Sequence, residues 1–516
     1  MTVKLYSGGA RVSADIGEEN RRARIEAVAT LPVYRNRREG LLTDLYQLTM
    51  MYGYYKSGRM NKRVVFDLFY RSNPCDNGYV ICAGLEQAAV YLHTLRFYPD
   101  EIAYLRGAGL FDEGFLRHLE EFRFTGTMHA VPEGSIVFPN EPLVRMEGRI
   151  FELQLIESAL LCFINHQSLI ATKAARIVLA THGALVEDAA HPTSEFGLRR
   201  AQNADAAVFG ARASYIGGCA STSNVAAGYN FQIPIAGTQA HSWIQSFDSE
   251  LEAFRAYVEA FPARAVLLVD TYDVLRSGIP NAIVVGRELR ARGQDLLAVR
   301  IDSGDLSYLS KEARKRLDAA GFHATQIIAS DDLDEDTIRD LMLQGAAIDG
   351  WGVGTALITA KDCPALGGVY KLAAEEEDGQ FVPRIKVSEN PVKVTNPGKK
   401  KVLRFYVDGM ANADLIMLDH ESTPQGEPVH LFDPVHTYKR KTIGEYTVRE
   451  LLQPIFVDGE FVYDLPTIEE IRAFTRAELQ TLPRETLRPK NPHVYHVDLS
   501  RELWELKQAL VARMRL

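Results

Sequence analysis

The stretch LLAVRIDSGDLSYLSKEARKRLDAAGF, residues 296–322, decides the fold of this chain. Its apolar run over 296–301 predicts a buried strand, the acidic and small residues at 302–304 predict a turn, and 311–319 has a helical pattern. A buried strand that leads through a short loop into a helix is the repeating unit of a parallel sheet. This stretch therefore predicts an α/β fold.

The same unit recurs between residues 230 and 360. Apolar runs there end in small or acidic residues, at Gly237-Thr238, Asp270-Thr271, Ser330-Asp331 and Gly354-Thr355. These ends mostly follow one another at intervals of about 30 residues, the repeat length of a (β/α) barrel. We expect an irregular, TIM-like α/β barrel whose strand ends meet on one face. An open, doubly wound sheet is the alternative that the pattern leaves open.

The sequence on both sides of this barrel has a different composition and hydrophobic pattern. Residues 1–38 form a polar, arginine-rich lead, which we expect to be an extension with modest structure that turnover does not need. Residues 39–180 predict an α+β domain, and 181–370 hold the barrel. Residues 371–516 predict antiparallel strands and two closing helices, and we expect them to pack with the N-terminal domain.

Composition and charge exclude several classes of partner. The 516 residues carry a formal net charge of −9, so no overall positive field draws nucleic acid or an anionic membrane. No apolar run approaches the roughly 18 residues of a membrane span, and the five scattered cysteines favour a reducing compartment. We expect a cytoplasmic protein with small-molecule partners, and solvated turns at the charged runs 375–378 and 399–401.

The motif EFGLRRAQ, residues 195–202, combines an aromatic ring with an arginine pair. Phe196 offers a face on which a flat ring can stack, and Arg199 offers a guanidinium that binds phosphate or carboxylate through two hydrogen bonds. A surface arginine pair beside a core phenylalanine is the structural alternative.

Small and hydroxyl side chains are dense in GGCASTSNVAAGYNFQIPIAGTQAHSW, residues 217–243. Ser223 and Thr238 lie in stretches where the backbone can approach a ligand closely. His241 follows a predicted strand end, where an imidazole can act as base, acid or nucleophile. A purely structural histidine is the alternative.

The motif VRIDSGD, residues 299–305, places two opposite charges on one face of a strand, because residues two apart in a strand point the same way. Asp302 is suited to a ribose hydroxyl or a metal-bound water, and Arg300 to a phosphate. A mutually satisfied Arg–Asp pair is the alternative. At the last strand end, GWGVGTAL (350–357) predicts a glycine-rich phosphate cradle.

In this order, the motifs resemble those of the nicotinate phosphoribosyltransferase family. The matching stretches are LLTDLYQLTMMYGYY (41–55), FDLFYRSNP (66–74), EFGLRRAQ, STSNVAAG (221–228), GTQAHSW (237–243), VDTYD (269–273), VRIDSGD, WGVGTAL (351–357) and GGVYKL (367–372). The resemblance covers about residues 39–405, and it implies the type II phosphoribosyltransferase barrel with an α+β domain built from both ends of the chain.

The resemblance also implies a reaction. Nicotinate attacks the anomeric carbon of phosphoribosyl pyrophosphate, which gives nicotinate mononucleotide and pyrophosphate for NAD biosynthesis. ATP hydrolysis is coupled to this step through a phosphorylated histidine, which matches His241, and Mg²⁺ accompanies the phosphates. No metal ligand is assigned by residue. A homodimer with shared sites is expected.

The resemblance implies a role for each motif. Tyr46, from the neighbouring subunit, and Phe196 sandwich the pyridine ring, and Arg199 contacts its carboxylate or the pyrophosphate. The ribose and pyrophosphate are held by Asp270, Arg300 and Asp302, and the 5′-phosphate by Ser330, Asp331 and the Gly352–Thr355 turn. The full expected set is His241, Asp302, Arg300 and Asp270 for catalysis, with Tyr46, Phe196, Arg199, Ser223, Thr238, Ser303, Gly304, Ser330, Asp331, Gly352, Gly354 and Thr355 for binding.

Ser223 bears on the choice of base. Related nicotinamide-using enzymes resemble this stretch but have an aspartate at this position, which accepts from an amide and repels a carboxylate. The neutral serine favours nicotinate. A nicotinamide phosphoribosyltransferase, the decarboxylating quinolinate enzyme and a non-catalytic relative that acts as an interaction protein are the alternatives. The quinolinate enzyme's cluster of basic residues is not seen.

Overall fold

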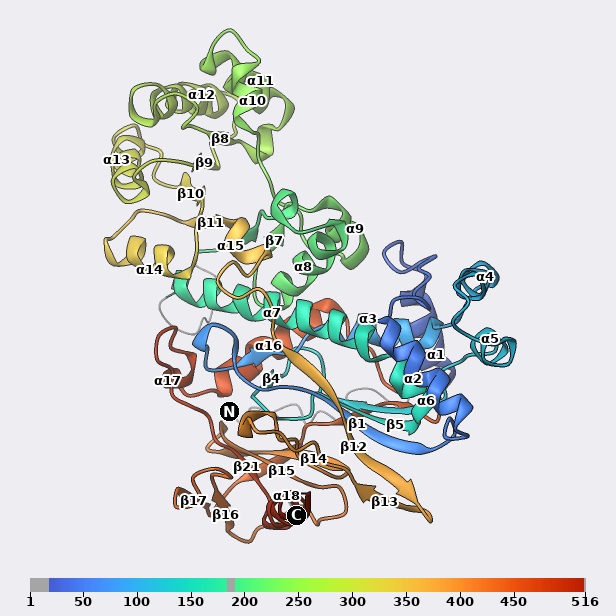
Figure 1. The fold of residues 1–516 in the computed structure, drawn as a ribbon. Coiled ribbons are helices and arrows are strands. Elements are labelled where there is room, and N and C mark those ends of the chain that lie inside the picture. The colour runs from blue at the N-terminus through green and yellow to red at the C-terminus, as the bar shows by residue number, and fades with distance from the viewer. Residues whose placement is uncertain (1–17, 183–190, 515–516) are drawn as a thin grey trace. The chain divides into compact units, whose positions relative to one another are not determined.

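The computed structural model describes residues 18–182 and 191–514, which divide into two compact units (Figure 1). The central unit spans residues 170–364, and the composite unit combines residues up to 169 with those from 365 onward. Helix α7 (Glu157–His182) runs across the first boundary. The boundaries thus lie at 169/170 and 364/365, whereas the sequence pattern placed them at 180/181 and 370/371.

The composite unit contains two larger sheets that are mainly antiparallel, and the first of them mixes strands from the two ends of the chain. Strand β1 (Arg63–Tyr70) lies between β12 (Gly368–Glu377) and β5 (Val144–Arg149) in a seven-stranded sheet ordered β13-β12-β1-β5-β3-β19-β20. The second sheet is ordered β18-β14-β15-β21, and in it β21 pairs with β15 in parallel whereas the other pairs are antiparallel. The other strands of these sheets are β3 (Thr127–Ala130), β13 (Gln380–Pro383), β14 (Lys400–Val407), β15 (Met410–Leu418), β18 (Thr447–Glu450), β19 (Gln453–Val457), β20 (Glu460–Phe461) and β21 (Val497–Leu499).

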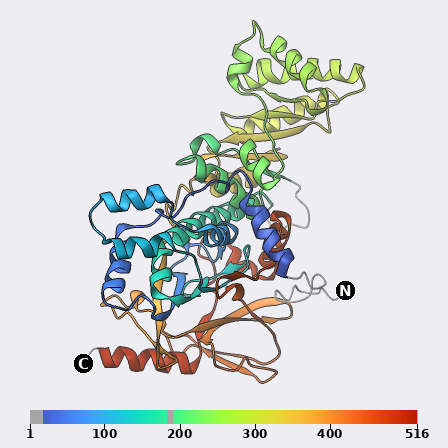
Figure 2. The ribbon, with the colours of Figure 1, turned by 90° about the vertical axis from the view of Figure 1, so that its right-hand side faces the viewer.

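Helices cover these sheets, and the last of them, α18 (Arg501–Met514), packs on β15 as the red helix that ends at C in Figure 2. Helix α2 (Leu45–Lys56) packs against α6 (Ile150–Leu155). The remaining helices of the composite unit are α1 (Glu18–Ala29), α3 (Leu85–Thr94), α4 (Pro99–Gly107), α5 (Glu113–Glu120), α16 (Ile468–Thr481) and α17 (Arg484–Leu487). Within 18–182 and 191–514, no helix combines the length and apolarity needed to cross a membrane.

The described part of the N-terminal lead is well packed, unlike the modest structure expected from its polar composition. Helix α1 buries Ile25 completely, and Tyr34 is 5% exposed with its hydroxyl donating to Glu86 at 2.8 Å. Residues 1–17 lie outside the described part. A few well-placed apolar side chains therefore dock this segment, although its average composition is polar.

The two charged runs are not simple solvated turns. Lys400 is 2% exposed in β14, where its Nζ lies 2.7 Å from Asp67 Oδ2 and donates to the carbonyl of Asn396 at 2.9 Å. Glu375 lies 6% exposed in β12 and pairs with Arg59 at 2.6 Å. The expectation failed because a charged side chain can be buried when another part of the chain supplies its partner.

The central unit has a six-stranded, wholly parallel sheet ordered β7-β6-β11-β10-β9-β8. Its strands are β6 (Thr193–Glu195), β7 (Ser221–Thr222), β8 (Val266–Leu268), β9 (Ala298–Ile301), β10 (Gln326–Asp331) and β11 (Gly350–Val353). The parallel sheet of strand–helix units is as predicted. The sequence pattern missed β6 and β7, because two or three residues are too few to show a period.

Helices follow the strands and bury an apolar core that contains Trp351, Phe322 and Phe254. Figure 1 shows α12, α13 and α14 along one flank of strands β8 to β11. The helices of this unit are α8 (Ala204–Ile216), α9 (Val225–Phe231), α10 (His241–Gln245), α11 (Glu250–Ala260), α12 (Ile279–Ala291), α13 (Leu306–Ala319), α14 (Glu335–Leu343) and α15 (Thr355–Ile358), with short turns η2 (Leu198–Arg200), η3 (Pro262–Arg264) and η4 (Val274–Gly278).

Strands β7 and β8 are the two ends of the sheet order. The apolar run at 233–235, expected to be a strand, forms a single parallel bridge between Ile235 and Thr222 of β7. Among the described residues, no backbone ladder joins β7 to β8.

Candidate active site

The carboxyl ends of the parallel strands gather the sequence-predicted residues at one edge of the sheet. These residues are Phe196 after β6, Ser223 after β7, Asp270 after β8, Asp302 after β9, Ser330 and Asp331 at the end of β10, and Gly354 after β11. Parallel pairing is sufficient for this arrangement, because every strand then ends on the same side.

Arg300 is the centre of this cluster. Its Nη2 donates to Asp302 Oδ1 at 2.7 Å, its Nε to Ser330 Oγ at 2.7 Å, and its Nη1 to Thr238 Oγ1 at 3.0 Å. The guanidinium carbon lies 5.7 Å from the centre of the Phe196 ring. The Arg–Asp pair exists, but it is part of a larger network, so one cation orders groups from four segments.

Asp302 is held as a carboxylate by this network. Partial burial alone would raise its pKa, but the charge of Arg300 and the hydrogen bonds from Ser330 and Arg300 outweigh burial and lower the pKa. Ser330 Oγ donates to the same Oδ1 that Arg300 contacts. The other oxygen, Oδ2, is turned toward His241. A lasting negative charge beside a cationic group is therefore available at neutral pH.

His241 is the first residue of α10 and remains accessible, with its side chain 41% exposed. Its Nε2 lies 3.6 Å from Asp302 Oδ2, and its Nδ1 lies 3.2 Å from Thr271 Oγ1. Thr271 was not among the expected site residues, although its place directly after Asp270 at a strand end was a usable signal. An exposed imidazole oriented from both sides is suited to accept a transferred group.

Asp270 connects the carboxyl end of β8 to the carboxyl end of β9 through hydrogen bonds. Its Oδ2 accepts from the Asp302 backbone N–H at 3.0 Å and from Ser303 Oγ at 2.6 Å, across the turn whose Gly304 has φ +85°. Its Oδ1 is buried and accepts no hydrogen bond from the residues that the structure describes. A buried acceptor of this kind is suited to a ligand hydroxyl or a cation-bound water.

The lack of a side chain at residue 352 makes room for the Phe196 ring. A Cβ on Gly352 would lie 2.4 Å from ring atoms of Phe196, well inside van der Waals contact. Gly354 follows in an unusual conformation, with φ −109° and ψ −99°, and Thr355 then begins α15. The glycine-rich turn therefore positions an aromatic face as well as a backbone loop.

Glu195 is a positioning residue that sequence reasoning missed. It is fully buried, accepts from Thr222 Oγ1 at 2.6 Å, and accepts from the Gly197 N–H, while its carbonyl accepts from the Ser223 N–H at 2.9 Å. Burial raises the pKa of its carboxyl group, although the hydrogen bonds from Thr222 and Gly197 act to lower it. Its place at the start of the EFGLRR motif was the available signal. Through these hydrogen bonds, Glu195 connects the loop after β6 to the loop after β7.

Arg199 and Tyr46, which were also expected in the site, lie outside the strand-end cluster. Arg199 is exposed on η2. Tyr46 belongs to the composite unit, on α2, where its side chain is 50% exposed and partial burial, followed by the charges of Glu157 and Asp44, raises its pKa. The central-unit cluster is therefore the part of the expected site whose contacts the structure describes.

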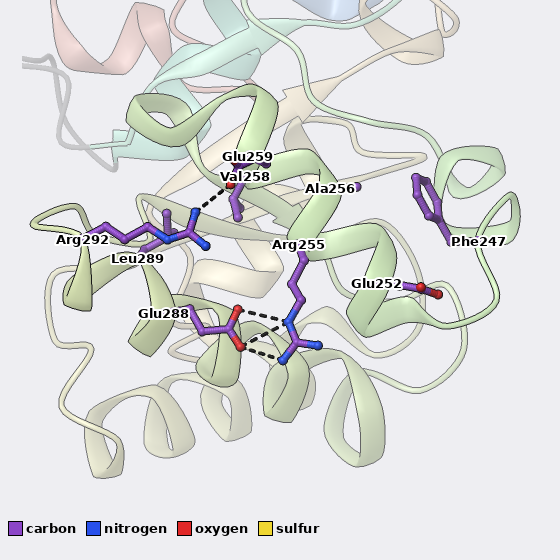
Figure 3. A pocket seen from close by; sticks show the side chains of 9 residues that line it. All are labelled: Phe247, Glu252, Arg255, Ala256, Val258, Glu259, Glu288, Leu289 and Arg292. Carbon is purple, nitrogen blue, oxygen red and sulfur yellow. Dashed lines mark hydrogen bonds and ion pairs between the residues drawn. The ribbon is translucent and has the colours of Figure 1, made fainter.

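A separate hollow of about 510 Å³ lies over α11 and α12 (Figure 3). Both arginines that line it are already paired, Arg255 with Glu288 at 2.6 Å and Arg292 with Glu259 at 2.7 Å. None of the strand-end residues lines it. It is a poorer candidate for a phosphate site than the strand-end cluster, since its arginines are paired with carboxylates without a ligand.

Comparison with known proteins adds to this geometry. Three family models match, with the descriptions nicotinate phosphoribosyltransferase N-terminal domain over residues 41–165, nicotinate phosphoribosyltransferase family over 192–380, and nicotinate phosphoribosyltransferase C-terminal domain over 399–507. The chain is 46% identical to a Bacillus subtilis nicotinate phosphoribosyltransferase, an alignment that covers 92% of this chain and 96% of that protein. It is 34% identical to the Homo sapiens protein of the same name, covering 92% and 96%.

Solved structures are similar as well. The crystal structure of human nicotinic acid phosphoribosyltransferase superimposes with a TM-score of 0.81 and 31% identity, over 91% of this chain and 99% of that one. A nicotinate-nucleotide pyrophosphorylase from Pyrococcus furiosus has a TM-score of 0.65 at 22% identity, over 92% and 98%, which concerns the fold alone. These similarities confirm the fold class expected from the sequence, that of a type II phosphoribosyltransferase.

Proposed function

This chain belongs to the nicotinate phosphoribosyltransferase family, and on that premise we propose that it joins nicotinate to phosphoribosyl pyrophosphate for NAD biosynthesis. The bond between the anomeric carbon and pyrophosphate breaks, and the pyridine nitrogen bonds to that carbon to give nicotinate mononucleotide. The observation that carries the proposal is the Arg300 network, which combines a cation with Asp302 and an accessible His241 at the strand ends.

The carboxylates of Asp270 and Asp302 supply the electrostatics of this step. As pyrophosphate leaves, the ribosyl group gains positive charge, which nearby carboxylates stabilise more in the transition state than in the bound substrate. Arg300 holds Asp302 in place and keeps it ionised. The unpartnered Oδ1 of Asp270 is available to a ribose hydroxyl.

We assign His241 to the coupling with ATP. Its ring nitrogen takes the γ-phosphoryl group, ADP leaves, and water later releases phosphate from the phosphohistidine. We assign phosphorylation to Nε2, because its 3.6 Å separation from Asp302 Oδ2 is longer than a hydrogen bond, whereas Nδ1 lies 3.2 Å from Thr271 Oγ1. The phosphoryl group would sit close to Asp302, so its charge acts on the release of pyrophosphate and not on the pyridine ring.

Mg²⁺ enters this proposal with the phosphates. Among the described residues, no group of three or more His, Cys, Asp or Glu side chains is arranged to hold a metal ion. Two carboxylates, one with an unpartnered buried oxygen, fit a Mg²⁺ ion that is bound mainly by substrate phosphates and water. When bound, the ion neutralises charge on the leaving pyrophosphate.

Recognition of the base and phosphate uses the neighbouring strand ends. Phe196 stacks on the pyridine ring, Arg199 and Ser223 face its carboxylate, and Tyr46 of a second copy of the chain supplies the other aromatic face. The 5′-phosphate is assigned to Ser330, Asp331, Gly352, Gly354 and Thr355, with Thr238, Ser303 and Gly304 completing the binding set.

The proposed active form is a cytoplasmic homodimer. Leu42, Leu45 and Tyr46 expose apolar side chains near the start of α2, at 42%, 57% and 50%. Such a patch is typical of a surface that another chain covers. Sedimentation velocity is expected to give twice the chain mass, and a monomer that turns over at full rate would contradict the shared site.

The direct test mixes purified protein with Mg²⁺, phosphoribosyl pyrophosphate and one of nicotinate, nicotinamide or quinolinate, with and without ATP. Nicotinate mononucleotide is expected from nicotinate, with ADP and phosphate formed alongside it when ATP is present. A kcat/KM with nicotinamide or quinolinate that equals or exceeds the value with nicotinate would overturn the substrate assignment. No product from any of the three would overturn the proposed activity.

A further inference from the structure

The segment 234–241 lies along the two free edges of the parallel sheet, at β7 and β8. On the β7 side, the Thr222 N–H donates to the Pro234 carbonyl at 3.0 Å, and the Ala236 N–H donates to the Thr222 carbonyl at 3.0 Å. In a parallel ladder, a residue forms its two backbone hydrogen bonds with the residues on either side of the one opposite to it. Thr222 does this with Pro234 and Ala236, which flank Ile235. The segment therefore begins as a one-residue continuation of the sheet.

On the β8 side, a side chain takes the place of a strand. In the orientation that gives both amide atoms a partner, Gln239 Nε2 donates to the Val266 carbonyl at 3.0 Å, and Oε1 accepts from the Leu268 N–H at 3.2 Å. The opposite edge of β8 is already used by β9, through the Val269 N–H to the Arg300 carbonyl at 3.0 Å. The carboxamide thus copies the peptide group of a seventh parallel strand, centred on Leu267.

The burial of this segment is concentrated in one side chain. From 234 to 240, Gln239 is the only buried residue, at 7% exposure, whereas Pro234, Ile235, Ala236, Gly237 and Ala240 are exposed. Residues close to Gln239 in sequence belong to the candidate active site. Thr238 accepts a hydrogen bond from Arg300, and His241 contacts Thr271, which follows β8.

We propose that Gln239 is a positioning residue, whose carboxamide completes the edge of β8 and so holds Thr238 and His241 over the ends of β8 and β9. The proposal rests on the proposed function, because it concerns the loop that carries His241. It predicts that phosphorylation of His241 and affinity for phosphoribosyl pyrophosphate both depend on a side chain that touches neither substrate.

The chemistry of the contact gives a specific prediction for a carboxyl group at this position. The contact needs a donor for Val266 and an acceptor for Leu268. In a Gln239→Glu variant at neutral pH, both oxygens are acceptors and the carbonyl faces a negative charge, but the protonated acid regains an O–H donor. The defect of this variant is therefore expected to shrink as pH falls. A Gln239→Met variant has neither group, and its defect is expected not to depend on pH.

The experiment compares wild type, Gln239→Glu, Gln239→Met and the control Gln326→Glu, which adds the same charge at an exposed position of β10. We measure phosphate transferred from radiolabelled ATP to the protein, KM for phosphoribosyl pyrophosphate, and hydrogen exchange of the peptide containing Leu268. At about pH 8 we expect both Gln239 variants to lose about tenfold in phosphorylation rate and to exchange Leu268 faster. At about pH 6 only Gln239→Glu is expected to recover, because burial raises the pKa of a carboxyl group.

Each other result has a definite meaning. Wild-type rates in both variants, or a Gln239→Glu defect that is the same at both pH values, would overturn the positioning role. If wild type takes up no phosphate, the phosphohistidine is wrong, and Gln239 is then judged by KM and by Leu268 exchange. Unchanged KM and exchange in the variants would overturn the proposal in that case also.

Discussion

His241 Nε2 lies 3.6 Å from Asp302 Oδ2, and the other oxygen of the same carboxylate accepts from Arg300 at 2.7 Å. One carboxylate thus lies between a permanent cation and an imidazole. The carboxylate orients the imidazole while it stays ionised, because the charge of Arg300 and the hydrogen bonds from Ser330 and Arg300 outweigh burial and lower its pKa. A phosphoryl group on Nε2 would place new negative charge next to Asp302, which gives ATP a physical means of influencing the same site.

Replacing His241 tests the coupling to ATP. His241→Ala is expected to abolish ATP-dependent stimulation and leave weak transfer at high phosphoribosyl pyrophosphate, because the ribosyl step itself uses Asp270 and Asp302. Nicotinate mononucleotide is measured with and without ATP. The control is His323→Ala, which removes an exposed histidine of the same unit. ATP stimulation that persists in His241→Ala would refute the assignment.

Charge at residue 223 tests the choice of base. Ser223→Asp is expected to lower the ratio of kcat/KM for nicotinate to that for nicotinamide by about tenfold, an effect of about 1.4 kcal/mol, because a carboxylate repels nicotinate. Ser246→Asp adds the same charge on an exposed position after α10 and is expected to leave the ratio unchanged. Equal ratios in wild type and Ser223→Asp would remove the specificity argument.

The lowered pKa of Asp302 predicts a pH dependence of stability. A carboxyl group whose folded pKa is depressed stabilises the fold above its unfolded pKa of about 3.9, and this contribution is lost as pH falls through the folded value. Between about pH 5 and about pH 2, wild type should therefore lose more unfolding free energy than Asp302→Asn. Denaturant unfolding across that range measures the difference. If the free energy of unfolding falls equally with pH in wild type and Asp302→Asn, the network does not hold Asp302 ionised.

The close approach of Gly352 to Phe196 predicts a defect in ring binding. Gly352→Ala places a methyl group 2.4 Å from the ring, so Phe196 must move. We expect KM for nicotinate to rise about tenfold, in the range of one aromatic contact. Gly107→Ala is the matched control, since its Cβ would meet no atom within 4 Å. An unchanged KM in Gly352→Ala would show that Phe196 does not contact the base.

The packed lead predicts a loss of stability when its buried side chain is shortened. Ile25→Ala should cost about 2–5 kcal/mol, the usual range for a buried isoleucine. Thermal unfolding checks this, with Val392→Ala as the control for an exposed apolar side chain. A Tm for Ile25→Ala equal to that of the control would mean that the helix is not docked in solution.

Much of the central unit could be predicted because its information is local. The strand–loop–helix stretch at 296–319 shows its period in a short window, and similar strand ends recur at Asp270-Thr271 and Ser330-Asp331, so the parallel sheet follows from the sequence. Strands β6 and β7 could not be found this way, because they are defined by pairing with β11 and with each other and not by their own composition. The same holds for Lys400, whose burial depends on Asp67, a residue far away in the chain.

By itself, the sequence determined the strand–helix order, the residues at each strand end and the resemblance to one enzyme family, since these depend on residue type and spacing along the chain. Only the tertiary structure decided that Arg300 bonds to Asp302, Ser330 and Thr238 together, and that Gln239 lies along β8. The physical reason is that a hydrogen bond depends on the distance and direction between groups from different strands, and these are set only when the sheet brings the strands together.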